Sequence, residues 1–413
     1  MVVTETRVGG QPVLVARPDG SSMGSLSIDM AGVLGRAHRS AAACCFLRPV
    51  SLAHEPLFNL VSNDVRRIEP GGGGERWLRL RWALSAARAT LAGWSSAAGE
   101  SFWREWYREL RRHIGDERLP YPLRLRLRAR ADRALDRSTR HGSRRAARPF
   151  PRRLLRERVP MTLRPDRLAA AERIALQHGI PVGSPIVGLQ CQSRVNLVHD
   201  AVDALNAAGY TVVRFGSPGS GALTRGALID LTTQDTVPEL DLYVLLKSAF
   251  VVCDSADVQH TTYLTGTPCL RLNAIEPFSA YPVRRDGLFT LAKAVELDSG
   301  RILSLDELHG ETYLKHPDHY AHVPHDARQV LDAVREMVDG VRHEWAEQQA
   351  QADYRERVGE AARSLQARVP LVRRWGVDGG FLGDGRLARV QAQAASSPSP
   401  PSNPRTGDEQ VAR

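Results

Sequence analysis

Several features are scarce in this chain of 413 residues, and each scarcity excludes a class of protein. The chain has no C-x-x-C spacing and only five cysteines, an odd number, so neither a disulfide scaffold nor a cysteine-based zinc module is expected. No run of about 18 apolar residues occurs, which excludes an ordinary membrane-spanning helix. The first twenty residues lack a basic stretch followed by an apolar one, so we expect no secretory leader and a cytoplasmic protein.

The cysteines and histidines do not group as metal ligands. We expect the five cysteines to be small buried apolar residues, three of them in or beside strands: Cys44, Cys45, Cys191, Cys253 and Cys269. Four histidines recur every third position in 316–325 (HPDHYAHVPH), but two prolines prevent one helix from aligning them. We therefore expect a surface loop here and no metal site.

Lysine is also rare, since only three lysines stand beside 53 arginines, and the positive charge is concentrated in one segment. Residues 104–158 hold 19 arginines against seven acidic residues, whereas the rest of the chain has 37 basic and 39 acidic residues. Such a segment would suit an anionic membrane surface or a nucleic acid. No helix-turn-helix, zinc-finger or RNA-binding motif accompanies it, so the sequence does not favour nucleic acid as the partner.

The order of expected elements indicates an α/β protein. Residues 12–18 predict a strand, 19–26 a Gly- and Ser-rich loop, 27–37 a helix and 42–47 a second strand. We assign 1–118 to a first domain and 119–160 to an Arg-rich connection, and we expect a disordered tail over 391–413.

A second α/β domain is assigned to 161–345, with closing helices over 346–390. Strands are expected at 186–190, 211–215, 228–231, 250–253 and 269–272, and helices at 166–178, 197–208, 238–247, 258–265 and 329–366. This alternation predicts a parallel sheet covered on both faces. Ligands bind outside the carboxyl ends of such strands, so the polar loops after them predict a nucleotide-sized ligand.

At this point the residues carry a family resemblance. The second domain resembles bacterial GT-B glycosyltransferases, in particular those of surface-polysaccharide synthesis that carry the element GY-x-VVR-x-G, here residues 209–216. Further matches follow in order: Asp241-Leu242-Tyr243, Gly266-Thr267-Pro268 with Leu272-Asn273 and Glu276-Pro277, and Lys293 before the segment 302–307. The set covers about 150 residues.

A more distant likeness is to heptosyltransferases, which also end a strand in FG-x-P-G, here residues 215–219. Their D-[ST]-G-x-x-H loop corresponds to 255–260, where His260 matches and Asp257 stands at the Gly position. Ser255 stands at the Asp position, unless Asp254 takes that role by a one-residue shift. In the first domain, heptosyltransferases have Asp directly after a loop glycine, whereas Gly24 here is followed by Ser25.

The resemblance implies a GT-B-like fold, with two Rossmann-like domains facing a central cleft and helices at the C-terminal end. It implies a glycosyltransferase that needs no metal or other cofactor and moves a sugar from a nucleotide sugar to a hydroxyl acceptor. The acceptor would be a polysaccharide intermediate, a lipid-linked sugar or a secondary metabolite, and the enzyme would work in the cytoplasm or at the inner face of the membrane.

Each candidate residue has a purely structural alternative. Asp19 is the candidate general base, or else a turn residue. Arg194 would hold the diphosphate, or else lie solvated in its loop. Gly216 and Ser217 would let the nucleobase approach, or else form a tight turn. The other donor-site candidates would bind phosphate, ribose or sugar, or else pack or cap: Ser255, Asp257, Gln259, His260, Thr261, Asn273, Glu276 and Lys293.

Three other functions stay open at this stage. The Gly-to-Asp change at 257 is compatible with a catalytically inactive GT-B fold that binds a sugar nucleotide or partners an active transferase. A sugar-nucleotide epimerase shares the fold without needing an acceptor. Nucleic-acid binding through residues 104–158 is the third, and salt-dependent retention on DNA would reveal it.

Overall fold

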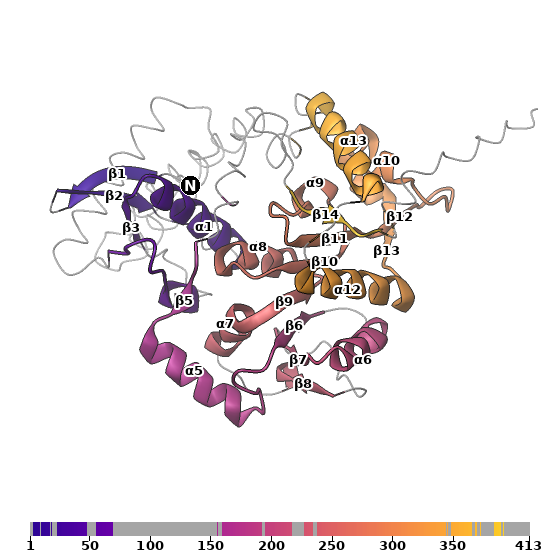
Figure 1. The fold of residues 1–413 in the computed structure, drawn as a ribbon. Helices are drawn as coiled ribbons and strands as arrows, with labels where there is room; N and C mark the ends of the chain where they lie inside the picture. Colours follow the sequence, from indigo (N-terminus) through magenta and orange to yellow (C-terminus); the bar gives the residue numbers. More distant parts are fainter. Residues whose placement is uncertain are drawn as a thin grey trace, which may run out of the picture.

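The computed structural model describes residues 3–8, 10–16, 23–47, 55–68, 159–191, 195–216, 227–233, 238–343, 348–365 and 384–389, with a few single positions between them (Figure 1). These residues form an α/β structure, as the sequence predicts. Within them, no helix combines the length and the apolar character needed to cross a lipid bilayer.

The N-terminal unit is a small sheet with one long helix. Strands β1 (Val3–Val8) and β2 (Gln11–Ala16) form an antiparallel hairpin, and β3 (Ala43–Phe46) lies parallel to β2. Helix α1 (Met23–Arg39) connects β2 to β3 and is long enough for the crossover that two parallel strands require, so the three elements form a β–α–β unit. Because β3 and the last four residues of β2 are buried on both sides, they lack the alternation of a half-exposed strand.

A short segment links this unit to the second one. The 3₁₀ helix η1 (Glu55–Asn59) precedes β4 (Leu60–Val61), which pairs antiparallel with β5 (Thr162–Leu163). Of the Arg-rich stretch 104–158, only Leu155 lies within the described residues, so its expected binding role is outside what the structure describes.

The second unit is built on a seven-stranded sheet in which every pair of neighbours is parallel. Its strands are β6 (Ile186–Gln190), β7 (Thr211–Arg214), β8 (Leu228–Asp230), β9 (Ser248–Cys253), β10 (Cys269–Ala274), β11 (Gly287–Leu291) and β14 (Arg386–Leu387). The spatial order is β14-β11-β10-β9-β6-β7-β8. The chain therefore starts in the middle, runs outward through β7 and β8, and returns to β9 on the other side of β6.

Helices cover both faces of this sheet, as predicted (Figure 1). One face packs in a single apolar cluster with α5 (Pro165–Gln177), α7 (Pro238–Lys247) and α8 (Ala256–Thr265). The opposite face packs with α6 (His199–Ala207) and α12 (Ala327–Arg342), through residues such as Val202, Leu205 and Met337.

The C-terminal part differs in two places from the sequence prediction. Residues 316–325, expected as a loop, form the 3₁₀ helix η5 (Pro317–His319) and then β13 (Tyr320–Val323), which pairs with β12 (Lys293–Glu296). The range 346–390 contains the long helix α13 (Gln349–Leu365), as predicted, but also the edge strand β14. Three short helices complete this part: α9 (Pro277–Ala280), α10 (Leu305–Leu308) and α11 (Glu311–Lys315).

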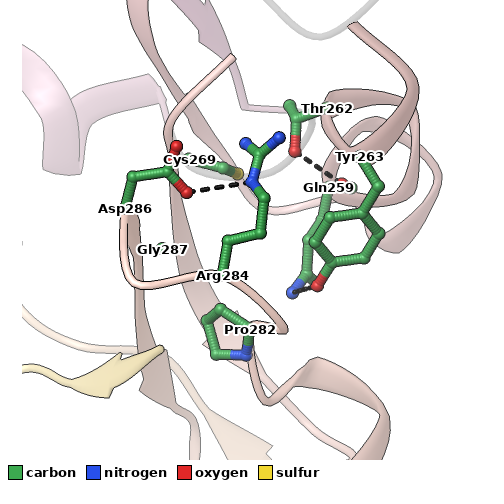
Figure 2. A pocket seen from close by; sticks show the side chains of 8 residues that line it. All are labelled: Gln259, Thr262, Tyr263, Cys269, Pro282, Arg284, Asp286 and Gly287. Atoms are coloured by element: carbon green, nitrogen blue, oxygen red, sulfur yellow. Dashed lines mark hydrogen bonds and ion pairs between the residues drawn. The ribbon is translucent and has the colours of Figure 1, made fainter. Parts of the chain in front are cut away.

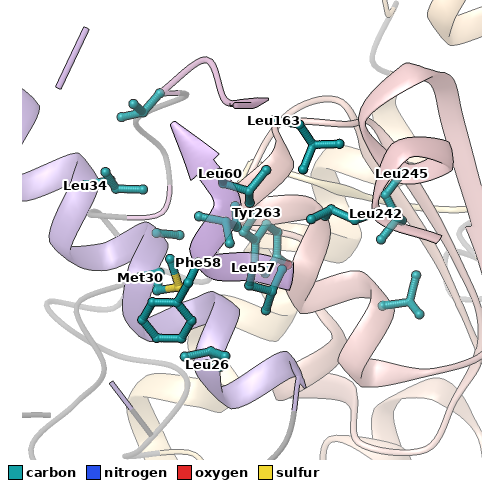
Figure 3. Close-up of a cluster of buried hydrophobic side chains, with 14 of the residues drawn as sticks. Leu26, Met30, Leu34, Leu57, Phe58, Leu60, Leu163, Leu242, Leu245 and Tyr263 are labelled. Carbon is teal, nitrogen blue, oxygen red and sulfur yellow. The ribbon is translucent and has the colours of Figure 1, made fainter. Parts of the chain in front are cut away.

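The two units share one apolar core (Figure 3). Leu26, Met30 and Leu34 of α1 belong to the same buried cluster as Leu242 and Leu245 of α7. Helix α8 lies between α1 and the sheet, and all its residues from 258 to 265 are buried. Apolar burial contributes about 25 cal/mol per Å², so the shared cluster stabilises the contact between the N-terminal unit and α8.

Candidate functional site

The reversal of strand order marks one point on the sheet edge. Strands β6 and β9 are neighbours, and the backbone N–H of Asp254 donates to the carbonyl of Gln190 over 3.1 Å just where both strands end. Beyond this point the chain leaves β6 toward α6 on one face and leaves β9 toward α8 on the other. In open α/β sheets, ligands bind at such a divergence, in the crevice outside the carboxyl ends of the strands.

Three side chains form a row across this edge, on the face covered by α8. The strand register places Gln190 of β6 beside Cys253 of β9, and Cys253 beside Arg271 of β10. Gln190 is only 3% exposed, and its Oε1 atom has no hydrogen-bond partner among the residues that the structure describes. The Nε and Nη1 atoms of Arg271 are also buried and, within the same described part of the chain, unpaired. We call these three residues the edge row.

The thiols near the edge row respond to the Arg271 charge. Cys253 and Cys269 are fully buried, with their sulfur atoms 3.6 Å apart. Burial raises the pKa of Cys253, but the Cys269 thiol and the Arg271 guanidinium together lower it below its ordinary value. The pKa of Cys269 is raised by its hydrogen bond to Cys253 and by burial. All five cysteines are buried, as the sequence predicts, and all five are free thiols.

Helix α8 starts directly after β9, with its first turn at the crevice. Ser255 is the N-cap residue in an extended conformation (φ −98°, ψ 131°), and its side chain makes no capping hydrogen bond within the described residues. The positive N-terminal end of α8 thus lies next to the carboxyl end of β9, and such a helix end favours anions. Asp257 lies in this first turn.

The other α8 candidates are engaged in packing. Gln259 Nε2 donates to the carbonyl of Ala280 over 2.7 Å. The Thr261 hydroxyl lies 2.8 Å from the Asp257 carbonyl, to which it donates, and 3.1 Å from the Ser27 hydroxyl of α1. The His260 ring stacks on Tyr263 at a centroid distance of 6.2 Å. The bond to Ser27 places Thr261 at the contact between the units, whereas the bond to Ala280 holds Gln259 against α9 within the second unit.

Gly24 of α1 meets the start of α8 at very short range. A Cβ atom added to Gly24 would lie 2.4 Å from Asp257 Oδ1, 2.8 Å from Asp257 Cα and 3.1 Å from His260 Nδ1. No side chain fits there, so glycine is what lets the first turns of α1 and α8 touch. The Asp257 carboxylate consequently lies at the junction of the two units, beside the switch point.

Strand β7 ends in a loop built around Gly216. Gly216 has a left-handed φ of 110°, and a Cβ there would meet Gln190 Cγ at 3.4 Å. Its backbone N–H bonds to the carboxylate of Asp241 in α7, yet burial raises the pKa of Asp241 to about 6. Behind this loop, fully buried Arg214 donates to Asp230 of β8 over 2.9 Å, and Asp230 also accepts from Thr232.

The remaining described candidates lie after β10. Asn273 has a left-handed φ of 51°, and its Oδ1 accepts from the His325 backbone N–H over 2.8 Å, which ties β10 to the start of α12. Glu276 is exposed at the start of α9. Lys293 lies on the β12 hairpin, where its charge contributes to lowering the pKa of His325, although burial of His325 is the larger cause.

Three predicted site residues lie outside the described residues: Asp19, Arg194 and Ser217. Two residues that the sequence reasoning missed, Gln190 and Arg271, lie in the edge row. Among the described residues, no group of three or more His, Cys, Asp or Glu side chains is arranged to hold a metal ion.

A small cavity lies apart from the crevice, near the amino ends of β10 and β11 (Figure 2). It is lined by Gln259, Tyr263, Cys269, Arg284 and Asp286 among others, and its volume of about 10 Å³ admits no more than about one water molecule. Its Arg284 bonds to Asp286 and to the carbonyl of Thr267. The cavity is therefore too small for a nucleotide, and the crevice at the carboxyl edge is the candidate functional site.

Known structures resemble this chain at low identity. ADP-heptose lps heptosyltransferase II from E. coli aligns at 12% identity and a TM-score of 0.39, over 80% of this chain and 99% of that one. A family 9 glycosyl transferase from Veillonella parvula aligns at 12% and 0.42, over 79% and 96%. UDP-GlcNAc 2-epimerase from Methanocaldococcus jannaschii aligns at 10% and 0.27, over 63% and 83%.

No protein-family model matches the chain, and no curated protein sequence matches it. The structural neighbours include heptosyltransferases and a family 9 glycosyl transferase, consistent with the sequence motifs, and also UDP-GlcNAc 2-epimerases. The TM-scores of these neighbours all lie below 0.5.

Proposed function

We propose that this protein is a glycosyltransferase that binds a nucleotide sugar at the carboxyl edge of the seven-stranded sheet and transfers the sugar to a hydroxyl acceptor. The observation that carries the proposal is the switch point between β6 and β9, where α8 begins against α1 of the N-terminal unit. The motif residues Gly216 and Glu276 support it, because they follow β7 and β10 at the carboxyl edge of the sheet, whereas Gly266 lies at the opposite edge, before β10.

The chemistry assigns a task to each side of the crevice. As the bond between the acceptor oxygen and the sugar carbon forms, the bond to the diphosphate breaks and its electron pair leaves with the nucleoside diphosphate. The first turn of α8, with Ser255, would stabilise that developing negative charge. A base must take the acceptor's proton, and Asp257, a carboxylate at the junction of the units, is our candidate. Asp19 stays a second candidate base.

The first test is a thermal-shift screen with UDP, GDP, dTDP, CDP and ADP, their sugar conjugates and the free nucleosides. A ligand present at 100 times its Kd stabilises the folded state by about 2.7 kcal/mol, so a real donor raises the melting temperature measurably. We expect one nucleotide family to give a clear shift. If none shifts a cooperatively melting protein, the proposal fails.

The second test separates transfer from binding. Purified protein, the selected nucleotide sugar and an acceptor-containing membrane extract should release nucleoside diphosphate, and the Asp257→Asn variant should release at least a hundredfold less while binding the nucleotide unchanged. Asp298→Asn, which changes an exposed turn carboxylate, is the control. Binding without turnover in the wild type would favour the inactive-fold alternative, and sugar isomerisation without acceptor would favour an epimerase.

The finer properties are part of the same proposal. We propose that the reaction needs no metal, so that activity persists in EDTA. We also propose that the acceptor is a polysaccharide or lipid-linked intermediate or a secondary metabolite, and that residues 104–158 bring the cytoplasmic protein to an anionic membrane. Flotation with phosphatidylglycerol vesicles at low and high salt tests the last point, since electrostatic binding weakens as salt rises.

A further inference from the structure

Arg271 is in an unusual position for an arginine. It lies on the inner strand β10, between β9 and β11, and the register places it directly beside Cys253. Two of its guanidinium nitrogens, Nε and Nη1, are buried and have no hydrogen-bond partner in the described part of the chain. A buried donor without an acceptor costs about 1–3 kcal/mol, and more when the group is charged.

The neighbourhood of Arg271 shows that its charge acts on the edge row. The guanidinium is among the groups that lower the pKa of the Cys253 thiol, whereas the nearby carboxylate of Asp254 raises it, and no ion pair joins Asp254 to Arg271 in the described part of the chain. A buried thiol is a weak hydrogen-bond acceptor and a poor counter-group for a guanidinium. The site thus has a cation whose preferred partner, an anion with planar or tetrahedral oxygens, is not supplied by the described side chains.

At the other end of the edge row, Gln190 has a buried acceptor that lacks a hydrogen-bond donor among the described residues. Gln190 is 3% exposed, and its Oε1 atom is an acceptor without a donor. Gly216 lies against the Gln190 side chain, because a Cβ added to Gly216 would be 3.4 Å from Gln190 Cγ. An amide oxygen accepts a hydroxyl or amino hydrogen and repels phosphate oxygens.

We infer that Arg271 binds the phosphate oxygens of the donor and Gln190 accepts from a hydroxyl or amino group on the same ligand. One molecule would satisfy both: an anion linked to a hydroxyl-bearing ring that reaches across two strand spacings of about 4.8 Å each, as in a nucleoside or sugar diphosphate. The cation for the diphosphate is then on β10, within the sheet, and its fork of N–H groups can bind two phosphate oxygens at once. This deepens the proposed function and rests on it for the nucleotide part only.

The test compares variants that differ in one property each. Arg271→Met keeps the length and removes the donors, Arg271→Lys keeps the charge and removes the fork, and Gln190→Leu removes the acceptor. Arg284→Met is the matched control, because Arg284 is a buried arginine at the opposite end of the strands with its own partners Asp286 and the Thr267 carbonyl. Each protein is titrated calorimetrically with inorganic pyrophosphate, with the nucleoside diphosphate selected by the screen and with its free nucleoside.

We expect Arg271→Met to weaken nucleoside diphosphate and pyrophosphate at least tenfold and to change nucleoside affinity less than twofold. Arg271→Lys should fall between wild type and Arg271→Met, Gln190→Leu should weaken the nucleotide and leave pyrophosphate unchanged, and Arg284→Met should bind as wild type does. Unchanged diphosphate affinity in Arg271→Met overturns the inference and leaves the proposed function intact. Pyrophosphate binding that depends on Arg271, with no nucleotide bound, overturns the proposed function and retains the anion site. If Arg271→Met does not fold, Arg271→Lys and Gln190→Leu decide in the same way.

Discussion

The contact between the two units can be tested with two glycines of the same helix. Gly24 and Gly32 both lie in α1 and both are buried, but they differ in what an added methyl group would meet. At Gly24 the Cβ would be 2.4 Å from Asp257 Oδ1 and 2.8 Å from Asp257 Cα, whereas at Gly32 no heavy atom lies within 4 Å. The flexible carboxylate can move away, but the backbone of α8 cannot move without shifting the helix.

The expected effects have opposite signs. Gly24→Ala forces α1 away from α8 by an appreciable fraction of an ångström, and such overpacking costs about 1–3 kcal/mol. Gly32→Ala meets no obstacle and gains about 0.5–1 kcal/mol, because alanine loses less backbone entropy than glycine in a helix. The free energies of unfolding of the two variants should therefore differ by about 1.5–4 kcal/mol.

Urea unfolding followed by circular dichroism measures this difference, provided the denaturant slope of both variants matches that of the wild type. If Gly24→Ala is as stable as Gly32→Ala, the described contact between α1 and α8 is wrong, and so is the placement of Asp257 at the unit junction. A second reading comes from donor turnover, which Gly24→Ala should reduce and Gly32→Ala should leave unchanged.

Three other predictions concern buried ionisable groups. Asp230→Ala should destabilise the fold by about 3–5 kcal/mol, because it leaves fully buried Arg214 without its carboxylate partner; thermal unfolding measures the loss. Burial raises the pKa of Asp241 to about 6, so between about pH 4 and 6 the native state holds a proton that the unfolded state releases, and the stability of the wild type falls as pH rises. The stability of Asp241→Asn relative to wild type should therefore increase by up to about 3 kcal/mol between pH 4 and 7. If the stability difference between the two proteins does not change with pH, the raised pKa of Asp241 is wrong. Burial lowers the pKa of His309 to about 4, so its contribution to stability is present above the ordinary histidine pKa and is lost as pH falls from about 6.5 to 4. His309→Gln should therefore be less destabilised relative to wild type at pH 4.5 than at pH 7. Denaturant unfolding at both pH values measures this.

Much of the second unit follows from local sequence pattern. The structure begins and ends β6 and α7 at the predicted residues, 186–190 and 238–247, because an unbroken apolar run and a proline start mark them. The parallel sheet also follows from the alternation of strands and helices. Strand β14 was missed because two residues, Arg386 and Leu387, carry no periodicity; only pairing with β11 makes them a strand.

The candidate site was harder to predict than the fold, for physical reasons that particular residues show. Arg271 has no distinguishing sequence signal in a chain with 53 arginines, and its importance depends on a register that pairs it with Cys253. His260 matches a loop motif in sequence and Gln259 and Thr261 stand beside it, yet residues 258–265 of α8 are buried, and these side chains contact neighbouring parts of the protein. Polar residues at a helix start predict a site only when the helix face they occupy is open.

The central claim is that the crevice between β6 and β9 holds a nucleotide sugar. Its most direct test is hydrogen exchange of the wild-type protein with and without the nucleotide that gives the largest thermal shift. The account predicts slower exchange in peptides spanning the carboxyl ends of β6, β9 and β10 and the first turn of α8, with little change at the amino ends of these strands. Protection confined to any other part of the chain, or none despite saturating ligand, would contradict it.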